Sequence, residues 1–215
     1  KQKELYHAHA QRLALMLQNQ TEEEFADSRF QVLSELTRLR QLCCDPALVY
    51  ENYEGGSAKL DLCIELIQSA VESGHKILLF SQFTSMIEIL TARLQEESIS
   101  YFVLQGSTKK EQRAQMVEQF NRDDTSVFCI SLKAGGTGLN LTGADIVIHY
   151  DPWWNVAVEN QATDRAHRIG QKNVVTVYKL IAKGTIEDKI IKLQQRKKEL
   201  AEEILSGDES KTASF

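Results

Sequence analysis

The sequence predicts an α/β fold in which a parallel β-sheet carries helices on both faces. Between residues 57 and 184, short apolar runs of strand length alternate with longer amphipathic stretches of helix length. The apolar runs are continuous rather than alternating, which is typical of strands buried on both faces. Each connection is long enough to hold a crossover helix, and such connections join parallel strands. A helical segment precedes this region and another follows it.

The region before the sheet is expected to be helical. Residues 1–44 contain neither proline nor glycine, and their leucines recur at spacings that fit one amphipathic face, so we expect helix throughout. Pro46 ends this section. Residues 50–56, which close with two glycines, are expected to form a loop or linker.

Local signals then bound the elements of the sheet region. Ser57 is expected to cap the first helix and Gly74 to end it in the left-handed region. Ser85 and Thr108, each followed three residues later by glutamate, are expected to cap the next two helices. A long final helix is expected from residue 185 to about 205. The expected strands cover residues 76–80, 101–104, 126–130, 146–149 and 174–177.

Composition sets wide bounds on function. The 215 residues are 42% hydrophobic and 26% charged, with a formal net charge of −5, as in an ordinary globular protein. Any nucleic-acid contact would need a local basic stripe, since the overall charge neither supports nor excludes one. No apolar run reaches membrane-spanning length, and no secretory signal is visible. The chain begins Lys-Gln-Lys rather than with methionine, which suggests a fragment of a longer protein.

The cysteines favour no metal or disulfide role. There are four cysteines, and no two of them form a Cys-x-x-Cys pair. We therefore expect reduced, mostly buried thiols in an intracellular protein, and no metal site.

Residues 131–143, the glycine-rich loop, hold four of the eleven glycines. Glycine lets a backbone approach a ligand closely and adopt positive φ. Gly136-x-Gly138 lacks the third glycine of a dinucleotide fingerprint, and no acid follows at the expected distance. A dinucleotide site is therefore disfavoured, and a loop that approaches some ligand closely is the better interpretation, with a tight connection between strands as the alternative.

Residues 161–171, the arginine segment, place Arg165 and Arg168 three residues apart, on one face of an expected helix. Guanidinium groups stay charged, and their fork of donors suits phosphate oxygens. Two of them could stabilise the charge that develops on a transferring γ-phosphate. The alternative is a solvated helical face with an Asp164–Arg168 ion pair. The chain has no P-loop and no acidic metal-binding motif after a strand, so phosphate-facing arginines imply half of a composite site.

Two further features are less specific. The adjacent Trp153 and Trp154 follow the expected strand 146–149, and neighbours in an extended segment point to opposite sides. At least one of them is expected to reach a surface, a partner or a ligand. The alternative is that both pack on an irregular turn. The basic residues of the final helix are interrupted by acidic ones, which favours a solvated, salt-bridged face over a DNA patch.

Five segments, in this order, resemble the second half of a Swi/Snf-type ATPase, the double-stranded-DNA-translocating branch of the superfamily-two helicases. They are Lys76–Thr84, Leu104–Thr108, Ser131–Leu141, Asp151–Asn155 and Gln161–Gln171. The stretch 39–46 is similar to the family's linker between lobes. The resemblance implies a helical protrusion and inter-lobe linker over 1–56. It also implies a RecA-like second lobe over 57–184 and a brace helix with a tail over 185–215.

The resemblance also implies roles for individual residues. Arg165 and Arg168 would be arginine fingers, and Gln161 would lie close to the γ-phosphate. Gly138 and Asn140 would line the nucleotide side of the cleft, and Trp154 would lie near DNA. The residues expected to follow the phosphates of one DNA strand are Ser81, Gln82, Gly106, Ser107, Ser131, Lys133, Ala134 and Gly135. ATP and Mg²⁺ would be held mainly by the first lobe, which this chain lacks.

The implied activity is ATP-driven movement on double-stranded DNA and remodelling of protein–DNA complexes, with this lobe inactive alone. Its partners would be the DNA backbone and the N-terminal lobe, without a membrane, and we expect a monomer. The compartment would be the cytoplasm of a bacterium or archaeon, or the nucleus of a eukaryote. The alternatives are a lobe of a helicase that acts on RNA or separates DNA strands, and a non-catalytic DNA- or protein-binding module.

Two positions depart from the family's usual pattern. Val156 stands where proline is usual, which would loosen that turn. Lys133 replaces a common arginine, which keeps the charge but loses bidentate geometry.

Overall fold

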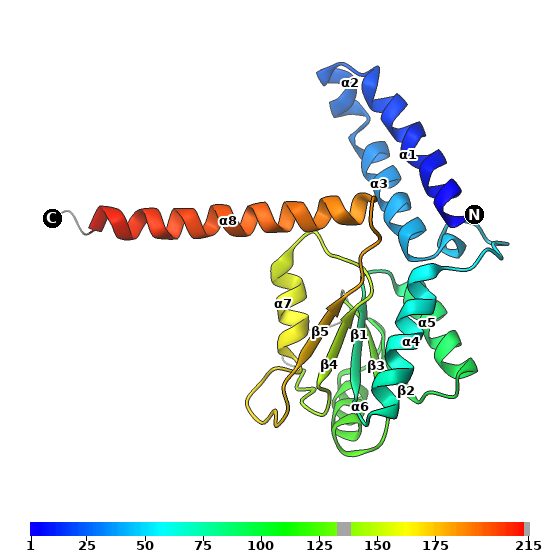
Figure 1. Ribbon diagram of the computed structural model, residues 1–215, viewed down its shortest axis with the longest axis vertical. Helices are drawn as coiled ribbons and strands as arrows, with labels where there is room; N and C mark the ends of the chain where they lie inside the picture. The colour runs from blue at the N-terminus through cyan, green and yellow to red at the C-terminus, as the bar shows by residue number, and fades with distance from the viewer. Residues whose placement is uncertain (133–138, 213–215) are drawn as a thin grey trace.

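The computed structural model describes residues 1–132 and 139–212, and within them a five-stranded parallel sheet forms the centre of the molecule (Figure 1). The strand order is β2-β3-β1-β4-β5, so β1 lies in the middle. Ile77 of β1 is in register with Val127 of β3 on one side and Ile146 of β4 on the other. The strands are β1 (Ile77–Ser81), β2 (Tyr101–Leu104), β3 (Val127–Ser131), β4 (Ile146–His149) and β5 (Thr176–Lys179). The predicted parallel α/β sheet is confirmed.

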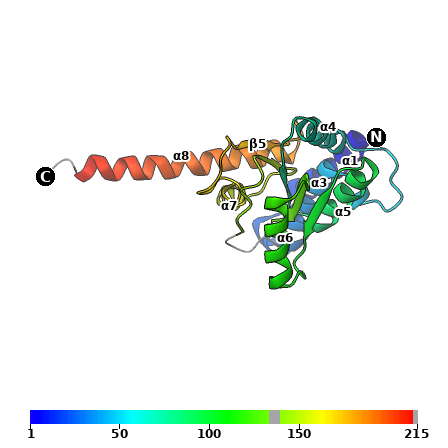
Figure 2. The same cartoon turned by 90° about the horizontal axis from the view of Figure 1, so that it is seen from below.

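Helices cover both faces of this sheet, as predicted (Figure 2). Because neighbouring residues of a strand point to opposite faces, β1 contributes to two cores. Leu79 packs in one core with α4 (Ala58–Glu72) and α5 (Thr84–Glu96). Phe80 packs in the other with α6 (Lys110–Arg122) and α7 (Val156–Asp164).

The predicted continuous helix over residues 1–44 is wrong, because the chain turns back on itself. It forms α1 (Gln2–Gln18), α2 (Glu22–Asp27) and α3 (Arg29–Cys44), followed by the short helix η1 (Pro46–Leu48). Thr21 starts α2 in a capping box with Glu24, in which each side chain accepts from the other residue's backbone N–H. α1 and α3 pack side by side through Leu13, Val32 and Leu39 and project from the sheet (Figure 1).

The predicted helix boundaries in the sheet region are partly confirmed. Ser57 caps α4 by accepting from the Leu60 N–H (3.3 Å), and Gly74 has φ +80° just after that helix. The predicted caps at Ser85 and Thr108 are wrong, because α5 begins after Phe83 and α6 after Lys109, both without a side-chain cap bond. Thr108 Oγ1 instead accepts from the Gln105 N–H (3.2 Å) within a tight turn.

β5 begins two residues later than predicted and lies at the edge of the sheet, with all four residues exposed. The long helix α8 (Ile186–Thr212) follows it. Ile186 and Ile190 of α8 pack on the helices α1 and α3, and Gln194 bonds to Glu159 of α7. Beyond these contacts the helix extends away from the body (Figure 1). None of the helices in the described residues combines the length and apolar character needed to cross a membrane.

Candidate functional site

The arginine segment does not place its two arginines on one helical face, so that prediction is wrong. α7 ends at Asp164, Arg165 is its C-cap, and the chain continues as irregular turns. Gly170, with φ +101°, permits the tight return that follows Arg168. Arg168 Nε donates to the backbone carbonyl of Asp164 (3.1 Å) instead of extending the helix.

The two arginines lie in different environments. Arg165 is only 6% exposed, and its guanidinium carbon lies 5.5 Å from the ring centroid of Phe80, within cation–π range. Burial, and then the charge of Arg168, lower the pKa of Arg165. Arg168 is exposed, and the neighbouring Ile169 is fully exposed. Arg168 is therefore presented at the surface, while Arg165 lies beneath it.

A buried histidine, His149, packs against Phe80, the same ring that Arg165 contacts. The His149 ring stacks on Phe80, with 5.5 Å between centroids, and its Nε2 lies 3.1 Å from Thr163 Oγ1. Burial lowers the pKa of His149 to about 4; nearby Glu159 opposes this shift and Lys179 adds to it. The imidazole is therefore neutral at physiological pH.

Acid should destabilise the fold through His149. The folded-state pKa of about 4 lies below the ordinary value of 6.5, so the unfolded chain binds the proton more tightly. The stabilisation is complete above about pH 6.5 and is lost as the pH falls toward 4. Titration of His149 should therefore make the free energy of unfolding about 2 kcal/mol lower at pH 5 than at pH 7.5. Urea unfolding of the wild type and of His149→Gln at both pH values measures it, and an equal acid loss in the two proteins would contradict it.

The end of the glycine-rich loop is tied to the arginine segment. The Leu141 N–H donates to the carbonyl of Arg165 (2.8 Å). Asn121, at the end of α6, donates to the carbonyl of Asn140 (2.8 Å) and accepts from the Gly143 N–H (2.9 Å). A Cβ on Gly143 would lie 2.9 Å from the Asn121 Cα, so this close approach requires glycine. The predicted site residues Lys133, Ala134, Gly135 and Gly138 lie outside the described residues.

Two of the predicted nucleotide-binding residues, Asn140 and Gln161, are exposed. Gln161 lies on α7, four residues before Arg165, and Asn140 directly precedes the residue that bonds to Arg165. The structure therefore brings both residues to the neighbourhood of the arginines.

Ser81 and Gln82, predicted to follow DNA phosphates, are buried instead. Ser81 Oγ donates to Asp151 Oδ1 (2.5 Å), and the Gln82 N–H donates to Asp151 Oδ2 (3.2 Å). The Gln82 amide oxygen accepts from the Arg40 guanidinium. Asp151 thus draws both side chains inward, and their predicted contact with DNA stays a prediction. Ser131, at the end of β3, is also buried.

Gly106, Ser107 and Trp154 lie nearer the surface. Gly106 and Ser107 are exposed in the turn after β2, and Arg113 of α6 donates to the Gly106 carbonyl (3.2 Å). Trp154 is half-buried, with the Arg40 guanidinium carbon 5.4 Å from its ring centroid. Trp154 packs with the helices α1 and α3, and Trp153 packs with the core under α6 and α7. The two tryptophans therefore pack on different sides of the turn while both remain half-buried, so the predicted surface or ligand role of Trp154 stays a prediction.

Sequence reasoning missed a buried acid that joins three elements. Glu159 of α7 is 1% exposed, and its carboxylate accepts from the Trp153 N–H (2.7 Å) and from Gln194 of α8 (3.2 Å). Its second oxygen lies 3.0 Å from Lys179 Nζ of β5. On a helix of mixed polarity, no local signal distinguishes this glutamate from a solvated one.

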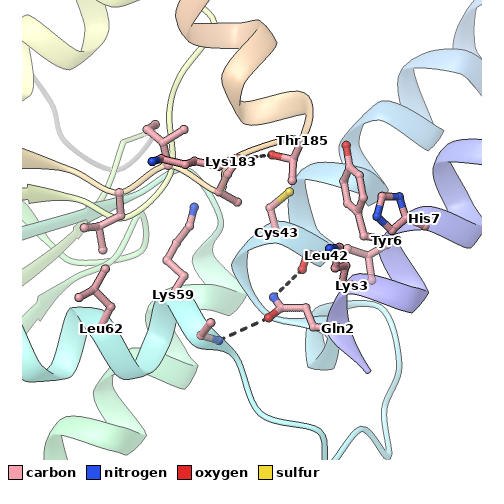
Figure 3. Close-up of a pocket in the computed structure, with 15 residues that line it drawn as sticks. Gln2, Lys3, Tyr6, His7, Leu42, Cys43, Lys59, Leu62, Lys183 and Thr185 are labelled. Carbon is pink, nitrogen blue, oxygen red and sulfur yellow. Dashed lines mark hydrogen bonds between the residues drawn. The ribbon is translucent and has the colours of Figure 1, made fainter.

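A cavity of about 640 Å³ lies between α1, α3, α4 and the segment that joins β5 to α8 (Figure 3). Gln2 bridges part of its wall by bonding to the Leu42 carbonyl and to the Ala58 N–H. Its lining is mostly apolar and includes none of the predicted nucleotide or DNA residues. The cavity is therefore separate from the candidate site.

The cysteines offer no metal site. All four are free and buried, and burial raises the pKa of Cys43 and Cys63 to about 12. Within residues 1–132 and 139–212, no three His, Cys, Asp or Glu side chains are grouped to hold a metal ion.

Comparison with known proteins decides the family. The model of the helicase conserved C-terminal domain matches residues 58–170, more than half of the chain. All of this chain aligns with the SWI2/SNF2 ATPase core of Sulfolobus solfataricus, solved in complex with dsDNA, at 33% identity and a TM-score of 0.77. The chain covers 45% of that core. The C-terminal domain of a Sulfolobus solfataricus SWI2/SNF2 ATPase, solved separately, matches 92% of this chain at 33% identity and a TM-score of 0.74, and this chain covers 81% of it.

The chain is a Swi/Snf-type helicase C-terminal lobe. This lobe is also 45% identical over 185 residues to an uncharacterised ATP-dependent helicase of Mycoplasma pneumoniae, covering 84% of this chain. It is 45% identical over 152 residues to the human chromatin-remodelling ATPase INO80, covering 70% of this chain. The lobe spans 18% and 10% of the lengths of these two relatives.

Proposed function

We propose that this Swi/Snf-type lobe is the second half of a double-stranded-DNA translocase, and that it supplies arginine fingers to ATP held mainly by a first lobe. One observation carries the proposal. Arg168 is exposed on a segment that is bonded to the end of the glycine-rich loop, with Gln161 and Asn140 exposed nearby. An exposed guanidinium group beside such a loop can stabilise the negative charge that develops on a transferring phosphoryl group.

The site would be composite. The sequence contains no P-loop, so this lobe does not cradle the β-phosphate, and its described residues offer no acidic cluster for Mg²⁺. The first lobe would therefore bind Mg²⁺ and ATP. Arg168 would reach the γ-phosphate when the lobes close, and Arg165 would support it from beneath.

DNA contacts would come from the carboxyl edge of the sheet, where the backbone of Gly106 and Ser107 is exposed. Lys133, Ala134 and Gly135 would add contacts, and Trp154 would lie beside them. Buried Ser81, Gln82 and Ser131 would support these loops from below. Contacts of this kind position a protein on the phosphate backbone without reading sequence. The dsDNA complex of the Sulfolobus ATPase core supports this proposal.

In the resulting cycle, ATP draws the two lobes together, and hydrolysis with product release lets them part. DNA-contacting loops on the two lobes then hold the duplex alternately, so that each ATP moves the enzyme along DNA. Proteins bound in its path would be displaced or remodelled, and the similarity to human INO80 supports that role. Residues 1–56 would form the protrusion and inter-lobe linker, and residues 185–215 would form the brace helix and tail.

Displacement of a triplex-forming strand tests the proposal against its alternatives. A two-lobe enzyme containing this lobe should release the third strand from a DNA triplex when ATP is added. It should leave a forked duplex paired. Unwinding of the fork without triplex displacement would favour a strand-separating helicase. DNA binding with neither activity would favour a non-catalytic module.

A further inference from the structure

We propose that Gln171 is a positioning residue that locks the arginine segment to the end of the glycine-rich loop, and thereby sets the position of Arg168. The inference rests on the proposed function, because it acts through the arginine finger. Gln171 itself touches neither nucleotide nor DNA in this proposal.

The Gln171 carboxamide binds both segments at once. Its Nε2 lies 2.7 Å from the carbonyl of Ala144, 3.0 Å from that of Ala166 and 3.1 Å from that of Thr142. Its Oε1 accepts from the Asn173 N–H (3.1 Å). The side chain therefore donates at one end to backbone carbonyls and accepts at the other, which a carboxamide can do and a carboxylate cannot.

Backbone bonds extend the same link on both sides of Arg168. The Gln171 N–H donates to the Arg168 carbonyl (3.0 Å), and the Leu141 N–H donates to the Arg165 carbonyl (2.8 Å). The carbonyl of Ala166, between the two arginines, is bound by the Gln171 side chain. The arginine segment therefore cannot shift relative to residues 141–144 without breaking several hydrogen bonds.

This link ties the position of Arg168 to that of residues 141–144, at the end of the glycine-rich loop. The glycine-rich loop contains the proposed DNA residues 133–135 in its first half, and its last residues bond to the arginine segment. α6 also holds the loop, through Asn121 and Gly143. A shift of residues 141–144 would then move Arg168 relative to the γ-phosphate, and a misplacement of about 1 Å can cost on the order of a hundredfold in rate.

A double-mutant cycle in the two-lobe enzyme tests the inference. Gln171→Met keeps the length of the side chain and removes the donor. It should lower the DNA-stimulated kcat on the order of tenfold to a hundredfold, with little change in the KM for ATP. In an Arg168→Ala background the same change should have less than about a twofold further effect, because coupled residues are not additive. Gln18→Met, the same change at an exposed amide of α1 outside the candidate site, is the matched control and should leave kcat nearly unchanged.

Gln171→Glu is the second variant, and thermal unfolding of every variant checks that it folds. Its carboxylate would face three carbonyl oxygens, so its loss should be at least as large as that of Gln171→Met. Unchanged kcat in both variants overturns the inference. So does an equal loss with and without Arg168, which would mark a merely structural role. If Arg168→Ala itself keeps normal turnover, the proposed function fails and this inference fails with it.

Discussion

Replacing Arg168 with alanine should lower the ATP turnover of a two-lobe enzyme by about a thousandfold or more, as expected for the loss of an arginine finger. Arg168 is the exposed member of the pair, and it lies on a segment held by hydrogen bonds on both sides. The γ-phosphate would lose a preorganised cation at the point where negative charge spreads. Single-turnover ATP hydrolysis with saturating DNA measures the effect on the chemical step.

Arg196→Ala provides the matched control for this experiment. Arg196 is an exposed arginine of α8, outside the candidate site, and its loss should leave turnover within about twofold of the wild type. DNA affinity should be similar in both variants, because Arg168 is proposed to meet the nucleotide. Near-normal turnover in Arg168→Ala would remove the finger from the mechanism.

The largest expected effect on stability comes from Lys59→Met, which should lower the free energy of unfolding by about 3–5 kcal/mol. Lys59 of α4 forms a salt bridge with Glu187 of α8, and their side chains are 6% and 1% exposed. Glu187 also accepts from the Ala182 N–H (2.8 Å). Without Lys59, the carboxylate would be left as an uncompensated buried charge.

Urea unfolding of the lobe at neutral pH measures this loss. Adding Glu187→Gln removes the buried charge and keeps an acceptor for the Ala182 N–H, so the double variant should regain most of the lost stability. A double variant as unstable as Lys59→Met would show that the lysine stabilises the fold by packing rather than by pairing. The salt bridge joins the sheet domain to the base of α8, so the same variant should also loosen α8.

The central strands were predictable because burial on both faces demands continuous apolar runs, and β1, β3 and β4 have them. The edge strand β5 was placed two residues too early, because the apolar pair Val174-Val175 precedes an exposed strand that has no such run. In residues 1–44 the leucine spacing continues across a turn. The capping pair Thr21 and Glu24 was the local signal of that break.

The site was predictable in chemistry rather than in geometry. Residue types and spacing identified Arg165 and Arg168 as candidates. The chain leaves the helix after Asp164, so one arginine is buried and the other exposed. This turn is held by a bond from Leu141 of the glycine-rich loop, which local sequence does not reveal. Asp151 likewise draws Ser81 and Gln82 inward from 70 and 69 residues away. Contacts between segments so far apart leave no local pattern in the sequence.

The most direct measurement is the rate of ATP hydrolysis by a two-lobe enzyme containing this lobe, with and without double-stranded DNA at constant salt. The wild type should be strongly stimulated by DNA, Arg168→Ala should lose that stimulated rate, and the lobe alone should hydrolyse no ATP. Turnover that is indifferent to both DNA and Arg168 would contradict the account and favour a non-catalytic binding module.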